Sequence, residues 1–464
     1  MGLLMMLLWS PPSFGIAATF YVDQNHVNAN DANAGTSEAA PWRTLPRAMA
    51  SDIVAGDIVY VKNGTYVDTS PAELSNPTPK FSPANSGRSD APIAIRAYTP
   101  STGPRHRPVV GRNLSTAAGE NSPVIGANTR DYIVWDGFTL ARGTDIGIWY
   151  CTGCVVENMV IDKGPPPVPW NGTGNYDGIR VEVASGTLIR NNIIRNVYYV
   201  GSTHSNAAAI KLYSTNNTRI SNNEISYSNT AIKDKQNGIS NVFERNYIHH
   251  IYGLAIEFTA NSSPRCGACP VQNIAIRNNI IAGGEMGIYL NLGSGTEDQN
   301  VDAYNNVMYD VTQGFGMYGA VRDIDVYNNI IVARASGNSA QINLTNIPSD
   351  WTSNYNDFQV MSGGTISFTA PTGPETLSQW LTRGYDPNSS TTAPLFVGPL
   401  TDITPATAFR LQTVSPLINA GRTGGVSSGA PVNMGAYLSD VDVIGLRTDL
   451  DTIAPSRPSG LVVR

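Results

Sequence analysis

A short motif recurs through the middle of the chain: an apolar residue, a variable one, an Asn pair or a substitute ending in Asn, and then two apolar residues. Examples are LIRNNIIRN (188–196) and IRNNIIA (276–282). The second Asn of each copy follows the previous one at intervals of 23 to 33 residues, at Asn192, Asn223, Asn246, Asn279, Asn306 and Asn329. A repeat this short cannot bury an apolar face alone and must stack on its neighbours.

A second apolar segment lies in each interval. Its copies are GIWY (147–150), GIRVE (178–182), AIKLY (209–213), AIKDK (231–235), AIEFT (255–259), GIYLN (287–291) and GMYG (316–319). Two or more strands per repeat, each about one turn apart, lie parallel and bring like residues into ladders. We expect an interior stack of isoleucines at Ile193, Ile225, Ile248, Ile280 and Ile330.

The recurrent Asn suits a sharp corner, where its amide can bond the backbone and the amides of neighbouring layers. We therefore assign these asparagines to the scaffold and predict an all-β chain folded as a parallel β-helix. The spacing is not the strict short hexapeptide repeat, which disfavours the left-handed form.

Several segments outside the repeat resemble exported right-handed β-helix proteins of the pectate-lyase-like superfamily. They are PWRTLPRAM (41–49), AGDIVYVKNGTY (55–66), IVWDGFTL (133–140), APLFVGPL (393–400), FRLQTVSPLINAGR (409–422) and NMGAY (433–437). The resemblance spans about residues 20 to 440. It implies a right-handed parallel β-helix with an N-terminal capping helix, a first strand in AGDIVYV and closing coils near the C-terminal end. The superfamily includes lyases, hydrolases, epimerases and noncatalytic proteins.

These features divide the chain. We expect a signal peptide at 1–18, a cap and first coils at 19–110, the β-helix core at 111–350, C-terminal coils at 351–440, and a linker at 441–464 that resembles the start of a fibronectin-like module. The apolar run of the signal peptide, from Leu3 to Trp9, is too short to span a membrane. We expect a secreted, periplasmic or cell-surface protein with no membrane span.

The four cysteines form two CxxC pairs, Cys151/Cys154 and Cys266/Cys269. Four thiolates in this spacing can bind zinc. The repeat separates the two pairs by about four coils, or roughly 19 Å at the spacing of parallel strands. We therefore favour two local disulfides formed in an oxidising compartment, with one long-range disulfide and spare thiols as the alternative.

Charge is scarce, since 14% of residues are charged and the net charge is -6, against a usual charged share of about 25%. This balance argues against a nucleic-acid-binding protein. The scarce charges gather on the outward face of the second strand, where alternate residues share a side. We expect a first row of Trp149, Arg180, Lys211, Lys233, Glu257, Tyr289 and Tyr318, and a second row of Glu182, Tyr213, Lys235, Thr259 and Asn291.

Three stacked cations in the first row would repel one another, and an acidic ligand would relieve that repulsion. The alternative is that these side chains pair with Glu182 and Glu257. In the otherwise apolar column between the rows, strict alternation points the carboxylate of Asp234 inward. Either the strand ends there or a buried carboxylate orients a neighbouring lysine.

A basic, Tyr-lined groove on an exported β-helix predicts an acidic polysaccharide such as alginate, pectate or a glycosaminoglycan as partner, bound by a monomer. Cleavage by β-elimination needs a cation for the carboxylate, a base, and an acid for the leaving oxygen. We assign Arg180 to the first role, Lys211 or Lys233 to the second, and Tyr213 or Lys235 to the third. The predicted substrate-binding residues are Trp149, Glu182, Glu257, Tyr289, Tyr318, His204 and Asn291.

The resemblance supports this assignment in part. Alginate and chondroitin lyases of this superfamily carry a Lys followed one coil later by an Arg; Lys233 fits the first position, but Glu257 occupies the second. In the calcium-dependent pectate lyases an acidic cluster holds the metal. Here Asp177, Glu182, Asp234 and Glu257 are scattered, so calcium stays open as a cofactor and no metal ligands are assigned.

Two other functions fit the same fold. A noncatalytic binding or adhesion protein could use the stacked Tyr and Trp side chains alone. A glycoside hydrolase needs two carboxylates about 5–9.5 Å apart, whereas Glu182 and Glu257 are three layers, or roughly 14 Å, apart.

Overall fold

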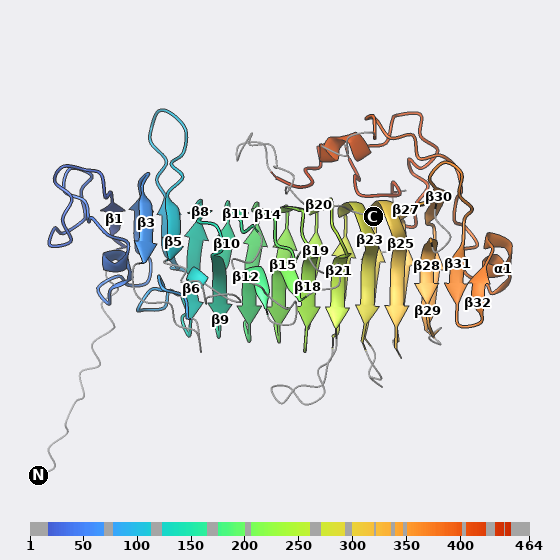
Figure 1. Cartoon of the computed structure of the whole chain (residues 1–464), viewed down its shortest axis with the longest axis horizontal. Helices are drawn as coiled ribbons and strands as arrows, with labels where there is room; N and C mark the ends of the chain where they lie inside the picture. Colours follow the sequence, from blue (N-terminus) through green and yellow to red (C-terminus); the bar gives the residue numbers. More distant parts are fainter. Residues whose placement is uncertain are drawn as a thin grey trace, which may run out of the picture.

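The computed structural model describes residues 17–68, 78–112, 123–164, 175–199, 206–259, 271–292, 299–319, 322–335, 339–346, 350–400, 405–423, 432–439 and 441–446. The described chain winds into one elongated solenoid, in which strands of successive coils lie side by side along the long axis (Figure 1). The predicted parallel β-helix is confirmed. The predicted signal peptide falls largely on residues 1–16, outside the described residues.

One sheet has twelve strands, one from each coil. They are β1 (Thr19–Val22), β2 (Ile58–Val61), β4 (Ile93–Ala97), β7 (Ile133–Asp136), β10 (Val155–Glu157), β13 (Leu188–Arg190), β16 (Arg219–Ser221), β19 (Val242–Glu244), β22 (Ile274–Arg277), β24 (Val301–Tyr304), β26 (Ile324–Tyr327) and β29 (Trp351–Asn354).

The remaining strands form two further columns. One holds β3 (Thr65–Asp68), β5 (Val109–Arg112), β8 (Thr139–Leu140), β11 (Val160–Asp162), β14 (Ile193–Arg195), β17 (Glu224–Ser226), β20 (Tyr247–His249), β27 (Ile330–Ala333) and β30 (Asp357–Val360). The other holds β6 (Pro123–Asn128), β9 (Asp145–Trp149), β12 (Tyr176–Glu182), β15 (Ala207–Tyr213), β18 (Thr230–Lys235), β21 (Leu254–Thr259), β28 (Ala340–Leu344) and β31 (Phe368–Ala370). The long strands β23 (Ile280–Asn291) and β25 (Val307–Tyr318) run through both columns.

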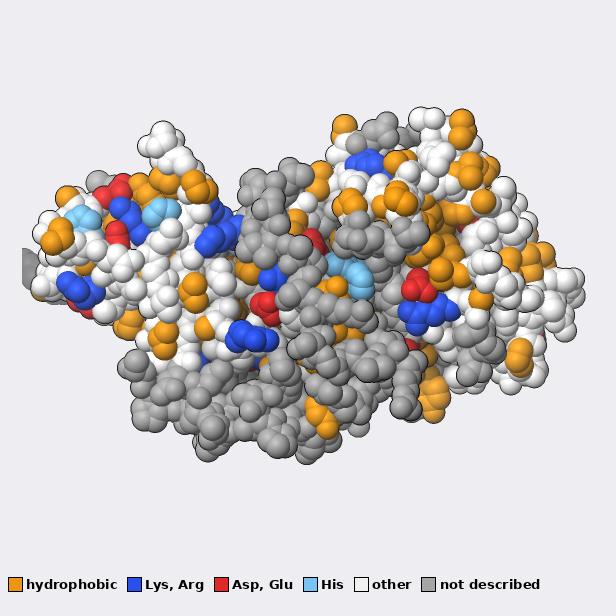
Figure 2. Space-filling model, turned by 45° about the horizontal axis from the view of Figure 1, so that its top comes forward, with side chains coloured by type: hydrophobic (Ala, Val, Ile, Leu, Met, Phe, Trp, Pro, Cys, Tyr) orange, Lys and Arg blue, Asp and Glu red, His pale blue; other side chains and the backbone are white. Residues whose placement is uncertain are grey.

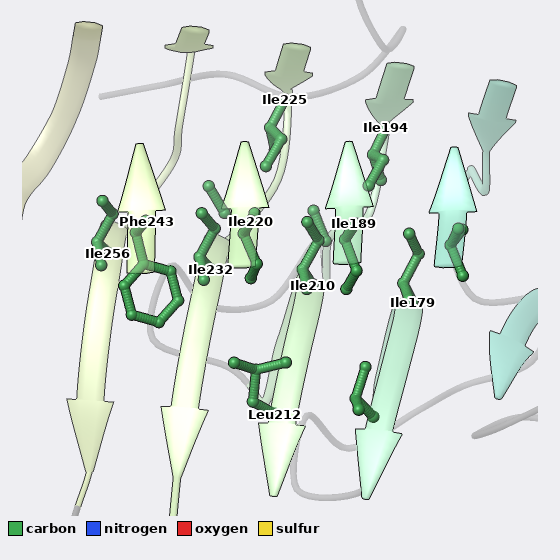
Figure 3. Close-up of a cluster of buried hydrophobic side chains, with 14 of the residues drawn as sticks. Ile179, Ile189, Ile194, Ile210, Leu212, Ile220, Ile225, Ile232, Phe243 and Ile256 are labelled. Atoms are coloured by element: carbon green, nitrogen blue, oxygen red, sulfur yellow. The ribbon is translucent and has the colours of Figure 1, made fainter. Parts of the chain in front are cut away.

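Stacks of aliphatic side chains fill the interior between the three columns (Figure 3). Ile179, Ile210, Ile232 and Ile256 come from the column that carries the charged rows, and all four are fully buried. Ile189 and Ile220 face them from the twelve-stranded sheet, and Ile194 and Ile225 from the third column (Figure 3). Each coil therefore covers the apolar face of the coil before it.

The recurrent asparagines form a ladder inside one corner of the solenoid. The side-chain Nδ2 of each donates to the Oδ1 of the next at 2.9 to 3.0 Å, through Asn192, Asn223, Asn246, Asn279, Asn306, Asn329 and Asn356. All seven side chains are fully buried. The preceding residue takes a left-handed backbone conformation, with φ of 55° at Asn191 and 56° at Asn222, which Asn tolerates better than most residues. The predicted scaffold role is confirmed.

The two ends of the solenoid are closed differently. At the N-terminal end the predicted capping helix is one turn of 3-10 helix, η1 (Pro46–Met49), with Trp42 and Leu45 fully buried beside it. The AGDIVYV strand is β2 rather than the first strand, because β1 precedes and pairs with it. At the C-terminal end, β31 and β32 (Gly373–Glu375) form a hairpin, followed by helix α1 (Leu377–Thr382), whose Trp380 is fully buried.

The segments that resemble closing coils do not form coils. The described residues between 384 and 446 contain no named strand and one 3-10 turn, η2 (Ala406–Phe409). They run back along the outside of β20, β23, β25 and β27 (Figure 1). Hydrogen bonds anchor them to the corner residues, including Asn278 Nδ2 to Ala436 O at 3.0 Å and Asn222 Nδ2 to Val443 O at 2.9 Å. We call this segment the strap.

The predicted interior stack of isoleucines is wrong in part, because some of these residues face outward and are covered by the strap. Ile225 and Ile248 face the interior, but Ile280 and Ile330 face outward, where they pack against Phe409, Leu417 and other strap residues in a second apolar cluster. Ile193 shares the outward row of Ile280 and Ile330, since its ladder partner is Glu224. The interior residues of these coils are the following ones, such as Ile194. Two adjacent isoleucines per repeat are therefore buried by two different layers.

We expect Asn279→Ala to lower the free energy of unfolding by about 2–6 kcal/mol, because it leaves buried partners unpaired. Asn279 Nδ2 donates to Phe243 O and Asn306 Oδ1, and its Oδ1 accepts from Asn246 N and Nδ2. Exposed Asn388 is the control, and Asn388→Ala should change stability by less than about 0.5 kcal/mol. Urea unfolding measures both; equal midpoints would contradict a stabilising ladder.

Asp234 sits within β18, so the strand does not end there. Its side chain is fully buried and accepts a hydrogen bond from Asn241 Nδ2 at 2.9 Å, with no lysine among its described partners. Burial raises the pKa of Asp234 from 3.8 to about 7, and the Asn241 hydrogen bond opposes this rise. Asp234 is therefore an interior structural residue whose burial favours the neutral form.

A raised acid pKa stabilises the fold below the unfolded-state pKa, and that contribution is lost as the pH rises through the folded-state pKa. For Asp234 the loss runs from about pH 4 to pH 7. We expect the free energy of unfolding of Asp234→Asn, relative to that of the wild type, to rise by about 4 kcal/mol between these pH values. Thermal unfolding of both proteins across the pH range measures the gap; a gap that stays constant with pH would contradict it.

Candidate active site

The predicted rows of outward side chains lie on β9, β12, β15, β18, β21, β23 and β25. The first row runs Gly147, Arg180, Lys211, Lys233, Glu257, Tyr289 and Gly316, and the second runs Trp149, Glu182, Tyr213, Lys235, Thr259, Asn291 and Tyr318. Trp149 and Tyr318 thus lie in the second row and not in the first. Ile148 aligns with Val181 and Met317 with Leu290, so the true first positions of those repeats lie two residues earlier than the sequence motif indicates.

A bend at the start of these strands brings an additional carboxylate into the site. Gly178 and Ile179 both face the interior: a Cβ on Gly178 would lie 2.9 Å from Ile194 Cγ2. Ala209, Ala231 and Ala255 hold the same position in the next coils and belong to the core. Because two consecutive residues point inward, Asp177 lies on the same face as Arg180 and Lys211.

The cations of the first row are paired with carboxylates. Lys211 Nζ lies 2.6 Å from Asp177 Oδ1, and Lys233 Nζ lies 2.8 Å from Glu257 Oε2. Arg180 Nε donates to Glu182 Oε1 at 2.6 Å. The predicted unrelieved repulsion among the three cations is therefore wrong. The alternative weighed from the sequence, pairing with Glu182 and Glu257, holds for Arg180 and Lys233.

Lys211 is fully buried, which makes it unsuitable as a base that must touch a polymer. Its Nζ also donates to Asn206 O and, at 3.3 Å, to Asn175 Oδ1. Burial lowers the pKa of Lys211 to about 7, although the adjacent Asp177 opposes the change. Lys211 and Asp177 together form a buried ion pair beneath the exposed part of the site.

Lys235 differs from the other three cations. Its side chain is half-buried, and among the described residues it has no hydrogen-bond or ion-pair partner. Its Nζ lies 5.4 Å from the ring centroid of Tyr213, and Arg180 approaches the same ring at 4.7 Å. Burial, followed by the neighbouring Lys233 charge, lowers the pKa of Lys235. A half-exposed amine with a lowered pKa is suited to proton abstraction.

The predicted binding residues lie around this cluster. Tyr289 and Asn291 are half-buried on β23, and Tyr318 is 54% exposed on β25. Glu257 accepts a hydrogen bond from Thr259 Oγ1 at 2.9 Å besides its pairing with Lys233. His204 lies outside the described residues.

Sequence reasoning missed a second buried pair one coil away. Lys163 Nζ lies 2.8 Å from Asp145 Oδ2 and also donates to the backbone oxygen of Asp177. Asn175 is a further missed residue, since it accepts from Tyr213 Oη at 2.8 Å. One signal was available: Asn175 and Asn206 both stand four residues before the first Ile of their repeats, at equivalent positions.

No group of three or more His, Cys, Asp or Glu side chains suited to a metal ion occurs among the described residues. Asp145 and Asp177 each lie against a lysine. These residues do not fit a calcium site. The predicted local disulfide is confirmed for Cys151 and Cys154, which removes both thiols from any zinc site; Cys266 and Cys269 lie outside the described residues.

Charged side chains form small mixed clusters, as the described residues of one face show in Figure 2. Among the described residues of the site, four cations (Arg180, Lys211, Lys233 and Lys235) face three carboxylates (Asp177, Glu182 and Glu257), so the charges nearly balance. No helix among the described residues is long and apolar enough to cross a membrane.

We expect Asp177→Asn to destabilise the fold by about 3–5 kcal/mol, because it leaves the Lys211 charge buried without its carboxylate. Replacing the pair by Asp177→Leu with Lys211→Met should restore most of that loss. The exposed Arg88–Asp90 pair is the control, and Asp90→Asn should change stability little. Urea unfolding compares the three; a double variant no more stable than Asp177→Asn would contradict this account.

Comparison with known proteins agrees with the fold. Residues 133–331 match the family model of the right handed beta helix region. A pectate lyase, Pel9A, has a crystal structure that aligns with 92% of this chain and 97% of its own, with a TM-score of 0.56 at 18% identity. A lacto-N-biosidase of Bifidobacterium longum subsp. longum is 27% identical over 214 residues, which are 42% of this chain but 12% of that protein. This chain is thus a right-handed parallel β-helix protein with a pectate-lyase-like fold.

Proposed function

We propose that the protein is a polysaccharide lyase that cleaves uronic-acid-containing chains by β-elimination, with Lys235 as the base. The observation that carries the proposal is the half-buried amine of Lys235, which has no ion-pair or hydrogen-bond partner among the described residues and lies beside the Tyr213 ring. This revises the sequence-based assignment of the base to Lys211 or Lys233, since both of those amines are ion-paired.

The reaction needs one proton removed and one supplied. Neutral Lys235 takes the proton beside the sugar carboxylate, a double bond forms, and the bond to the leaving oxygen breaks. Lys233, two residues earlier on the same strand, attracts the carboxylate and disfavours the charged form of Lys235. Tyr213 lies beside Lys235 but is buried and its Oη donates to Asn175 Oδ1, so the protonated Lys235 amine returns the proton to the leaving oxygen. Arg180 remains paired with Glu182, and its guanidinium also packs against the Tyr213 ring.

A glycoside hydrolase is the second candidate, favoured by the matched segment of the lacto-N-biosidase. Its requirement for two free carboxylates about 5–9.5 Å apart is poorly met. Glu182 and Glu257 stand three coils apart, roughly 14 Å, and both contact cations. Asp177 contacts the same Arg180 as Glu182, but it is fully buried and paired with Lys211. A noncatalytic glycan-binding protein is the third reading.

We also propose that the protein acts outside the cytoplasm, as a secreted, periplasmic or cell-surface protein. The Cys151–Cys154 disulfide supports this, because such bonds persist in oxidising compartments. The apolar N-terminal run of the sequence has the character of a signal peptide.

One assay separates the three readings. The protein is incubated with pectate, alginate and chondroitin sulfate, with and without a chelator, and both ultraviolet absorbance of unsaturated ends and new reducing ends are followed. A lyase yields both signals. New reducing ends without absorbance indicate a hydrolase, and binding with neither signal indicates a noncatalytic protein.

We expect Lys235→Ala to lower kcat/KM by about 10²–10⁴-fold, the usual contribution of a general base. In the wild type, kcat/KM should rise with pH and level off below the ordinary lysine pKa of 10.5, because the pKa of Lys235 is lowered and the neutral amine reacts. Lys62→Ala is the control, as Lys62 is ion-paired with Glu38 far along the solenoid. Full activity in Lys235→Ala would overturn the assignment of the base.

A further inference from the structure

Two aromatic side chains on the outward face each lie close over a glycine. A Cβ on Gly147 would come within 3.1 Å of Trp149 Cζ2, and a Cβ on Gly316 within 3.2 Å of Tyr289 Cδ2. Contacts this short leave no room for a larger residue unless the ring moves away. Glycine at these two positions therefore lets each ring lie against the sheet.

Each ring is part of a small apolar platform. Pro79 Cγ and Pro123 Cβ would both lie 3.2 Å from a Cβ on Gly147, beside the Trp149 indole. Met286 Sδ would lie 3.4 Å from a Cβ on Gly316, beside the Tyr289 ring. Both rings are half-buried, so part of each ring surface remains accessible. A partly exposed aromatic ring of this kind suits the apolar face of a sugar ring.

The two platforms stand on opposite sides of the charged cluster. From Gly147 to Tyr289 the first row takes five ladder steps, through Arg180, Lys211, Lys233 and Glu257. Five steps at the spacing of parallel strands are about 24 Å. A pyranose with its glycosidic oxygen is about as long as one such step. A polysaccharide lying parallel to the long axis would therefore place about six sugars from one platform to the other.

We infer that the site binds an extended run of about six sugars along the axis, one stacked on Trp149 and one on Tyr289, with the acidic sugar to be cleaved over Lys235 between them. The inference rests on the proposed function for the sugar class. It adds the direction of the chain and an endo mode of action, since the cleaved bond lies inside the bound run. The products would be unsaturated oligosaccharides of several lengths.

The test measures binding without turnover, in the Lys235→Ala background, by isothermal titration with oligogalacturonates and oligomannuronates. We expect Trp149→Ala and Tyr289→Ala each to weaken binding of a heptamer by about tenfold, from the loss of one stacking contact. Binding of a trimer, too short to reach both platforms, should fall less than twofold for at least one of the two variants.

Two further variants separate stacking from general damage. Gly316→Val keeps Tyr289 but displaces its ring, so it should weaken heptamer binding as Tyr289→Ala does. Tyr150→Asn removes a neighbouring aromatic residue that is 54% exposed and has a φ of 52°, and it should leave binding unchanged. Unchanged heptamer affinity in Trp149→Ala and Tyr289→Ala, or no heptamer binding at all, would overturn the inference.

The lyase assay is read independently of this titration. Unsaturated products from the wild type with no effect of either platform variant would refute the platforms and leave the lyase proposal standing. Platform-dependent binding without unsaturated products would refute the lyase proposal and leave the platforms standing.

Discussion

Hydrogen bonds that run parallel to the long axis, from one coil to the next, are the constraint on which the rest of the molecule depends. The asparagine ladder shows this most directly. In each coil of the ladder, the Asn Oδ1 accepts from both the backbone N–H and the side-chain Nδ2 of the Asn one coil earlier, as Asn279 does for Asn246. The ladder ends where Asn356 donates to Asp386, whose other oxygen accepts from the indole of Trp380. A coil cannot shift its register without leaving buried polar groups unpaired, so equivalent residues of successive coils stay aligned.

That alignment creates the site. Side chains that are far apart in sequence become neighbours because each occupies the same place in its coil, as Arg180, Lys211 and Lys233 do. Their charges do not accumulate, because a carboxylate stands beside each of them. What distinguishes the cluster is Lys235 at its partly exposed edge, a cation with no ion-pair partner among the described residues. The charges of the described site thus nearly cancel. Under the proposed function, recognition of an acidic ligand would depend on the position of Lys235 more than on a strong net charge.

Much of this arrangement could be predicted from the sequence, because the length of the repeat and the alternation of inward and outward residues do not depend on the exact strand boundaries. The repeat was enough to predict the solenoid, the role of Asn279 and the rows containing Lys211 and Lys233. It could not separate register shifts of two residues, which preserve the inward and outward faces; Trp149 and Tyr318 were misplaced for this reason. It also could not foresee the bend at Gly178, which turns Asp177 outward, because strict alternation assigns that residue to the interior. The ion pairs and the strap depend on contacts between segments far apart in the chain, which a local sequence pattern does not specify.

The strap has a consequence for the order in which the chain can fold. Its apolar residues, such as Phe409 and Leu417, pack on a surface assembled from four separate coils, so this surface does not exist until those coils have stacked. During synthesis the outward row of Ile280, Val307 and Ile330 is made well before the segment that covers it. In that interval the growing solenoid carries an uncovered apolar stripe beside an open strand edge, a combination that favours association with other chains. Once the strap is synthesised and packs on this row, the apolar side chains are no longer exposed.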